Sequence, residues 1–155
     1  MEFTNDFFAV NLFYEHKYYP ESSNYHSTLL RRVDCVSPEE YYHPDFIIEI
    51  IDKKAEKTFY YLFDAKYSVL KNVKFLHLPS LEKKYIARTG ISGDRYKKIN
   101  GLFALFPDEE GEKIVDDTFF EPQIALIASK PSVESELKTY IQRILKKHIG
   151  DYLLS

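Results

Sequence analysis

The chain has 155 residues, of which 45% are hydrophobic and 16% aromatic, and its formal net charge is −3. This length predicts one domain with a sizeable core, and the many tyrosines and phenylalanines suit a β-rich sheet. The lone Cys35 excludes an internal disulfide and a cysteine metal cluster, and no apolar run approaches the roughly 20 residues that span a bilayer. The start of the chain lacks the features of a signal peptide, so we expect a cytoplasmic protein.

The first part of the chain is typical of strands separated by polar turns. We expect strands over Phe7–Tyr19 and Ser27–Val36, separated by the turn sequence ESSN. Two further apolar runs, Ile47–Ile51 and Thr58–Ala65, are rich in β-branched and aromatic residues and are joined by the polar segment DKKAEK. This pattern predicts a β-hairpin.

The predicted hairpin brings three charged residues together at one end. Its turn centres between Lys54 and Ala55, so Asp45 and Asp64 are equally far from the centre and should face each other, about 4.5–5.5 Å apart at Cβ. Lys66 follows two residues after Asp64 and therefore shares its face of the strand. Two carboxylates can hold a divalent cation, and an ammonium group beside them can steer a water towards a phosphate. An ordinary charged strand end is the alternative interpretation.

The chain after the hairpin alternates between helix and strand. Tyr67–Leu78 is either extended or a loop, and Ser80–Arg88 predicts a short helix that is capped by its first residue and ended by Gly90. The segment ISGDRYKK is a polar loop. We expect buried strands over Ile99–Phe106 and Gln123–Ser129.

The clearest helix lies near the C-terminus. Ser132 is its expected N-cap, and Gly150 is expected to end it. Six apolar residues form one stripe at helical spacing: Val133, Leu137, Tyr140, Ile141, Ile144 and Leu145. This stripe predicts core packing and no part in catalysis.

Charge is unevenly distributed along the chain. Residues 66–100 carry nine bases and two acids, whereas residues 106–121 carry one base and seven acids. We expect the acidic run to be a solvated loop. The basic segment begins at Lys66, where a phosphate backbone would lie if the hairpin forms an active site. The candidate nucleic-acid contacts in it are Lys71, Lys74, Lys83 and Lys84.

Other kinds of site have little support in the sequence. The histidines are scattered without the spacing of a zinc site. The chain has no glycine-rich phosphate loop in a strand–helix context and no Gly-x-Ser-x-Gly motif.

The hairpin residues also carry a family resemblance. HPDFIIEI followed by FYYLFDAKYS resembles the PD-(D/E)XK nuclease superfamily, in particular a branch found in bacterial restriction and defence proteins. GLFALFPDEEG resembles the next core strand of that family, and PQIALIASKPSVESELKTYIQRIL resembles its last strand and terminal helix. The resemblance covers residues 7–149. It implies an α/β (α+β) restriction-endonuclease-like fold, in which helices flank a mixed central sheet.

The resemblance implies a DNA endonuclease that depends on Mg²⁺ or Mn²⁺. Asp45 and Asp64 would be the metal ligands and Lys66 the catalytic lysine, while Tyr67 matches the motif without a clear chemical role. DNA would be the main partner, and a homodimer would supply the two sites that a double-strand break needs.

One departure from the family concerns its N-terminal core helix, which usually carries a catalytic glutamate. No helical pattern precedes the first strand here. The chain is then a single nuclease-like domain (residues 1–155) cut from a larger protein, a domain whose helix and glutamate come from a partner, or an inactive copy that binds nucleic acid or protein. Glu49 lies about 13 Å along the strand from Asp45, too far to share a metal, and the register of Glu15 is not fixed by the sequence.

Overall fold

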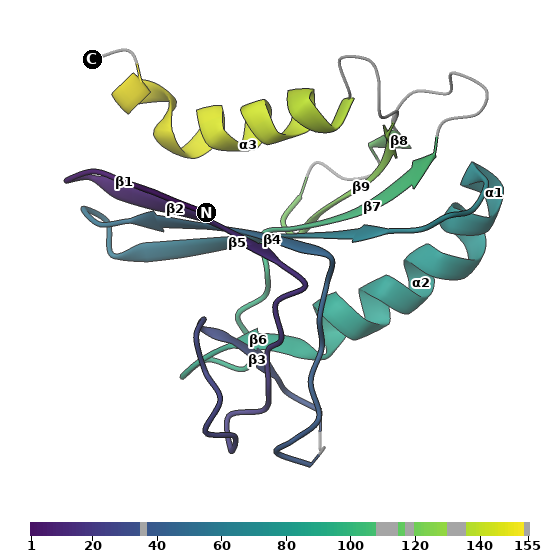
Figure 1. Ribbon diagram of the computed structural model, residues 1–155, viewed down its shortest axis with the longest axis horizontal. Helices are drawn as coiled ribbons and strands as arrows, with labels where there is room; N and C mark the ends of the chain where they lie inside the picture. Colours follow the sequence, from purple (N-terminus) through teal and green to yellow (C-terminus); the bar gives the residue numbers. More distant parts are fainter. Residues whose placement is uncertain (35–36, 108–114, 117–119, 130–135, 154–155) are drawn as a thin grey trace.

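The structure is a computed structural model that describes residues 1–34, 37–107, 115–116, 120–129 and 136–153. A seven-stranded sheet with the order β1-β2-β4-β5-β7-β9-β8 forms its centre, with helices on both faces (Figure 1). The strands of this sheet are β1 (Glu2–Thr4), β2 (Phe8–Tyr14), β4 (Phe46–Asp52), β5 (Lys57–Ala65), β7 (Gly101–Pro107), β8 (Val115–Asp116) and β9 (Gln123–Ser129). The predicted α+β class, with a mixed central sheet and flanking helices, is confirmed.

The sheet changes from antiparallel to parallel pairing at β5. Strands β1, β2, β4 and β5 pair antiparallel, whereas β5, β7 and β9 run parallel, and β8 closes the edge antiparallel to β9. A parallel neighbour needs a long crossover connection, and the helical chain between β5 and β7 supplies it. Residues 1–14, all of which the structure describes, contain β1 and β2 and no helix.

The crossover is one continuous helical run, which we call the crossover segment (residues 70–87). It consists of α1 (Leu70–Asn72), η1 (Val73–His77), α2 (Leu78–Leu81) and η2 (Glu82–Ala87), where η1 and η2 are π-helical. The expectation that residues 67–78 are extended or a loop is therefore wrong from residue 70 onwards. Two features hide this helix in the sequence: Pro79 lies inside it, and its N-cap Val69 offers no side-chain cap. Gly90 lies in a strand and does not end the helix.

Alternation along the strands builds a hydrophobic core on each face of the sheet. On one face the crossover segment contributes Val73, Leu81 and Tyr85, which pack with the even-numbered residues of β5 and β7, Tyr60, Leu62, Leu102 and Ala104. On the other face α3 (Glu136–Leu153) contributes Tyr140 and Ile144, which pack with Tyr61, Phe63, Phe103 and Leu105. Asp64 and Lys66 continue the even-numbered series, which places them on the face of the crossover segment.

Helix α3 confirms the predicted apolar stripe over the residues that are described. Tyr140 and Ile144 are buried, whereas Ser132 and Val133 lie outside the described residues. The expected end at Gly150 is wrong, since the helix continues to Leu153. Glycine weakens a helix by about 1 kcal/mol but ends it only when the backbone turns left-handed, and φ of Gly150 is not positive. None of the described helices has the length and apolar character to cross a membrane.

A small lobe lies on the same side of the sheet as the crossover segment (Figure 1). The lobe consists of the connection between β2 and β4, so far as it is described, together with β6 (Thr89–Ile91). In it β3 (Leu30–Arg32) and β6 form a two-stranded sheet. The first two predicted strands are shortened accordingly. The one expected over Phe7–Tyr19 ends at Tyr14, because Glu15 turns the chain with a φ of +46°. The one expected over Ser27–Val36 is limited to β3.

Candidate active site

The hairpin of β4 and β5 has the register that the sequence predicts. Its pairs run from Asp52 opposite Lys57 to Phe46 opposite Phe63, and one further step places Asp45 opposite Asp64. A hydrogen bond fixes this end, since the backbone N–H of Ala65 donates to Asp45 Oδ2 over 2.5 Å. The other end is closed by Asp52, whose Oδ1 accepts two backbone N–H groups of the turn.

Asp64 is only 5% exposed, and both of its carboxylate oxygens have partners. The ammonium group of Lys66 forms an ion pair with Oδ1, so a cation is already stabilised at this oxygen. The hydroxyl of Tyr85 donates to Oδ2 over 3.0 Å. Lys66 is held by its backbone N–H, which donates to the carbonyl of Leu105 on β7 over 2.7 Å. Contacts from β5, from β7 and from η2 of the crossover segment therefore fix this carboxylate and its lysine.

Tyr85 is a site residue that the sequence did not reveal. Burial and the nearby charge of Asp64 both raise the pKa of Tyr85, so its hydroxyl stays protonated and acts as a donor. The sequence predicts a helix over Ser80–Arg88 that includes Tyr85, but it contains no signal for which face of that helix meets the sheet.

Of the four lysines expected to contact nucleic acid, Lys84 lies over the ring of Tyr85, whose hydroxyl donates to Asp64. All four lie on the crossover segment, where Lys71 and Lys83 are exposed. Burial lowers the pKa of Lys84, while the charges of Asp64 and Asp45 oppose this shift. Lys84 is thus within electrostatic reach of both site carboxylates.

The structure also gives Glu15 and Glu49 their places. The register of β2 and β4 continues past Tyr14 opposite Phe46, so that the N–H of Glu15 donates to the carbonyl of Asp45 over 2.9 Å. Glu15 is thus the neighbour of Asp45 on the side away from Asp64, and its side chain is exposed. Glu49 is buried and accepts hydrogen bonds from Tyr60 and Asn11, which marks it as structural.

The carboxylate pair fits a hard divalent cation by its donor chemistry. Among the described residues, Asp45 Oδ1 has no hydrogen-bond partner, and Asp64 Oδ1 already pairs with a cationic group. Mg²⁺ commonly takes one or two carboxylates and completes its shell with water and phosphate oxygens. No group of three or more acidic, histidine or cysteine side chains that could hold a metal ion is present in the described part of the chain. Water and substrate oxygens are the further ligands that Mg²⁺ commonly takes at such a pair.

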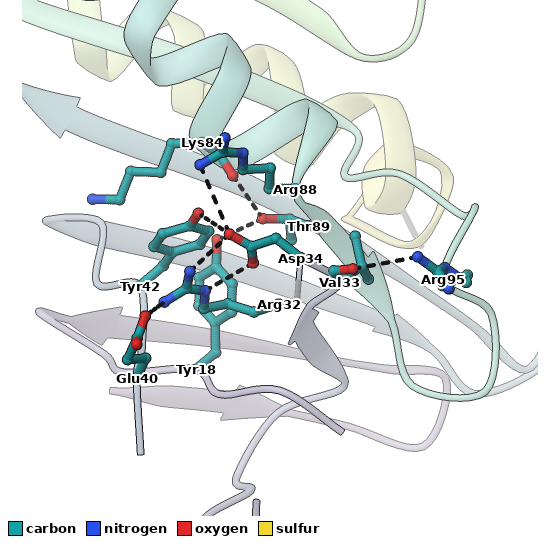
Figure 2. Close-up of polar contacts among 10 residues, drawn as sticks. All are labelled: Tyr18, Arg32, Val33, Asp34, Glu40, Tyr42, Lys84, Arg88, Thr89 and Arg95. Atoms are coloured by element: carbon teal, nitrogen blue, oxygen red, sulfur yellow. Dashed lines mark hydrogen bonds and ion pairs between the residues drawn. The ribbon is translucent and has the colours of Figure 1, made fainter. Parts of the chain in front are cut away.

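Figure 2 shows a polar network around Asp34 in the lobe. It adjoins the site through Tyr42, whose ring meets that of Tyr85 edge to face. Arg32 forms a two-pronged ion pair with Asp34, with distances of 3.0 and 2.7 Å. The hydroxyl of Tyr42 donates to Asp34 Oδ2 over 2.9 Å, and the guanidinium of Arg32 lies 4.0 Å from the centre of the Tyr42 ring. Burial acts to raise the pKa of Asp34, but hydrogen bonds from Arg32 and Tyr42 outweigh it and hold that pKa below its ordinary value.

Comparison with protein-family models, with curated proteins and with solved structures finds no match to this chain. Its function is therefore inferred from the chemistry of the site.

Proposed function

We propose that this chain is a nuclease domain of the PD-(D/E)XK type that hydrolyses DNA phosphodiester bonds with Mg²⁺ or Mn²⁺, as restriction and defence nucleases of bacteria do. One observation carries the proposal. Asp45 and Asp64 stand opposite each other in the register of β4 and β5, one step beyond Phe46 and Phe63, with Lys66 in contact with Asp64. Structural ion pairs also end strands, but two opposed carboxylates are a costly arrangement that a bound cation would relieve.

Each residue of the site has a distinct task in this proposal. Asp45 and Asp64 would hold the cation, which when bound polarises a phosphoryl oxygen and lowers the pKa of its water. Lys66 would orient the attacking water or neutralise the charge that develops on the phosphate. Tyr85, which donates to Asp64 Oδ2, would keep that carboxylate in one rotamer.

DNA would lie along the crossover segment in this proposal. The segment carries Lys71, Lys74 and Lys83, and Tyr85 joins it directly to the carboxylate pair. Contacts from such lysines to backbone phosphates supply affinity without sequence preference. Sequence or modification specificity would then come from other domains or from a partner.

A catalytically inactive module on the same scaffold, which binds nucleic acid or a protein, is the second candidate. It is favoured by the engagement of both oxygens of Asp64 and by the absence, among the described residues, of a group of three or more side chains that could hold a metal ion. The two candidates differ in one measurable property, since only the nuclease needs to bind a divalent cation through Asp45 and Asp64.

Calorimetric titration with Mn²⁺ tests this difference. We expect the wild type to bind Mn²⁺ and the variants Asp45→Asn and Asp64→Asn each to lose at least about tenfold in affinity, because an amide lacks the negative charge of the carboxylate that it replaces. Asp52→Asn is the matched control. Asp52 is the last residue of β4, whereas Asp45 directly precedes β4, about 23 Å away. Asparagine at position 52 can still accept the two N–H groups of the turn.

Cleavage of supercoiled plasmid in the presence of Mn²⁺ is then measured for the same variants. Loss of cleavage with Asp45→Asn and Asp64→Asn, but not with Asp52→Asn, supports the nuclease. A folded wild type that gives no binding heat with Mn²⁺ would contradict it and favour the binding module.

A further inference from the structure

Lys84 is a half-buried cation whose charge has no counter-ion in the described part of the chain. None of the described carboxylates lies within ion-pair distance of its ammonium group, whereas Lys66 in the same site is paired with Asp64. Burial of a cation without an anionic partner is unfavourable, and burial does lower the pKa of Lys84. The ammonium group is therefore open to an anion from outside the described residues.

Two aromatic rings hold Lys84 in place. Its Nζ lies 4.6 Å from the centre of the Tyr85 ring and 5.2 Å from that of Tyr42. The two rings meet edge to face, 6.0 Å apart. Ring faces attract an ammonium group but leave its hydrogen-bond donors free. The position of Lys84 is therefore fixed while its donors remain able to bind an oxygen anion.

The ring of Tyr42 is in turn fixed by the lobe. Its hydroxyl donates to Asp34, whose carboxylate is held by Arg32, and Arg32 also lies over the Tyr42 ring. Figure 2 shows Lys84 extending past Tyr42 and away from the Asp34 carboxylate. The lobe thus supports Lys84 without neutralising it.

Tyr85 connects the ammonium group of Lys84 to the carboxylate pair. Its ring face contacts Lys84, and its hydroxyl contacts Asp64. The charges of Asp64, Lys66 and Asp45 all act on Lys84. An anion bound by Lys84 would therefore lie close to whatever Asp45 and Asp64 hold.

We propose that Lys84 is a second substrate-binding lysine of the site, whose ammonium group contacts a non-bridging oxygen of the phosphodiester at the Asp45–Asp64 pair, with Tyr42 as its positioning residue. This rests on the proposed function and deepens it. The substrate's phosphate is held between Lys66, which directly follows β5, and Lys84 from the crossover segment. The role differs from that expected of Lys71, Lys74 and Lys83, which would contact the backbone away from the scissile bond.

Lys84→Met tests the proposal, because methionine keeps most of the side chain's length but removes its charge. We measure Mn²⁺ binding by calorimetry, binding of a short fluorescein-labelled DNA duplex in Ca²⁺ by anisotropy, and cleavage of the same duplex in Mn²⁺. Lys146→Met is the matched control, since Lys146 is exposed on α3, over the opposite face of the sheet. Lys84→Arg keeps the charge. It provides a second test of the proposal if Lys84→Met does not fold.

We expect Lys84→Met to leave Mn²⁺ affinity within about twofold while lowering kcat by about 10²-fold, the usual effect of removing one charge-stabilising donor. The slope of log Kd for the duplex against log salt should fall by about 1. Lys84→Arg should retain duplex binding, and Lys146→Met should behave as the wild type does.

The positioning role of Tyr42 has its own readout. Tyr42→Leu removes the ring and should lower kcat with little change in KM, whereas Tyr42→Phe keeps the ring and should recover most of the rate. The double variant Lys84→Met/Tyr42→Leu should be no slower than Lys84→Met alone, because residues that act through one group are not additive. Additive losses would assign Tyr42 a merely structural role and overturn this part of the proposal.

The possible outcomes distinguish the proposal for Lys84 from the proposal that Asp45 and Asp64 hold a metal ion. If Mn²⁺ binds through Asp45 and Asp64 but Lys84→Met matches Lys146→Met in duplex binding and kcat, the Lys84 proposal is overturned and the nuclease stands. If Mn²⁺ does not bind but the duplex does, and Lys84→Met weakens that binding at least about tenfold, Lys84 remains an anion contact and the nuclease fails. A wild type that does not bind the duplex overturns the role of Lys84.

Discussion

Replacing Tyr85 by phenylalanine removes one hydroxyl from the interior of the protein. Tyr85 is fully buried, and its hydroxyl donates to the carboxylate of Asp64. A hydrogen bond to a charged group contributes about 1.5–3 kcal/mol to stability, whereas a neutral one contributes about 0.5–1.5 kcal/mol. We therefore expect Tyr85→Phe to lower the free energy of unfolding by about 1.5–3 kcal/mol.

Tyr18 provides the matched comparison. It is 2% exposed and belongs to the same core, but its hydroxyl bonds to the hydroxyl of Thr89 over 2.8 Å, a neutral partner. Tyr18→Phe should therefore cost only about 0.5–1.5 kcal/mol. Urea unfolding at neutral pH, extrapolated to zero denaturant, gives both values.

A double-mutant cycle isolates the charge. With Asp64→Asn as the background, Tyr85→Phe should fall into the range of the neutral bond, so that the coupling energy between the two positions is about 1 kcal/mol or more. Equal costs for Tyr85→Phe and Tyr18→Phe, or the same cost in both backgrounds of residue 64, would refute the reasoning that Tyr85 stabilises a charged Asp64.

Three further changes have directions set by the structure. Gly101→Ala should lower the free energy of unfolding by about 1–3 kcal/mol in urea, since its Cβ would lie 2.7 Å from the Tyr61 ring. Burial lowers the pKa of His148, which contacts the Tyr61 hydroxyl over 2.6 Å, so the unfolded chain binds the proton more readily. Thermal melts should then show stability falling as pH drops from above 6.5 to below the folded pKa, and His148→Gln should flatten that fall; an unchanged slope would contradict it. Asp34→Ala leaves the buried guanidinium of Arg32 without its main partner and should cost about 3 kcal/mol in urea, whereas a loss below about 1 kcal/mol would show that the pair does not stabilise the lobe.

The part of the site that the sequence predicts is the part built by local pairing. Asp45 and Asp64 lie on strands joined by a tight turn, so the alternation of apolar residues and the position of the turn fix their register. The same reasoning could not place Glu15. The strands β2 and β4 are joined by a long connection, so their register depends on contacts between residues far apart in sequence.

The crossover segment was predicted only in part, because its helical signals are weak. Pro79 and the absence of a side-chain cap at Val69 conceal where it begins. The roles of Tyr85 and Lys84 depend on how this segment is rotated over the sheet, and packing of the whole core sets that rotation. The partnership of Tyr42 with Lys84 is likewise a contact between distant parts of the chain.

The connection from Tyr14 to Phe46 leaves and re-enters the sheet between two strands that pair directly. Because those strands hydrogen-bond to each other, the chain between them can change in length without breaking the sheet. Loop-closure entropy rises slowly with length, so doubling such a connection costs only about 0.6 kcal/mol. Insertions at the exposed positions of this connection would thus leave the pairing of β2 and β4 intact, and because Tyr42 lies within it, they could also adjust the environment of Lys84.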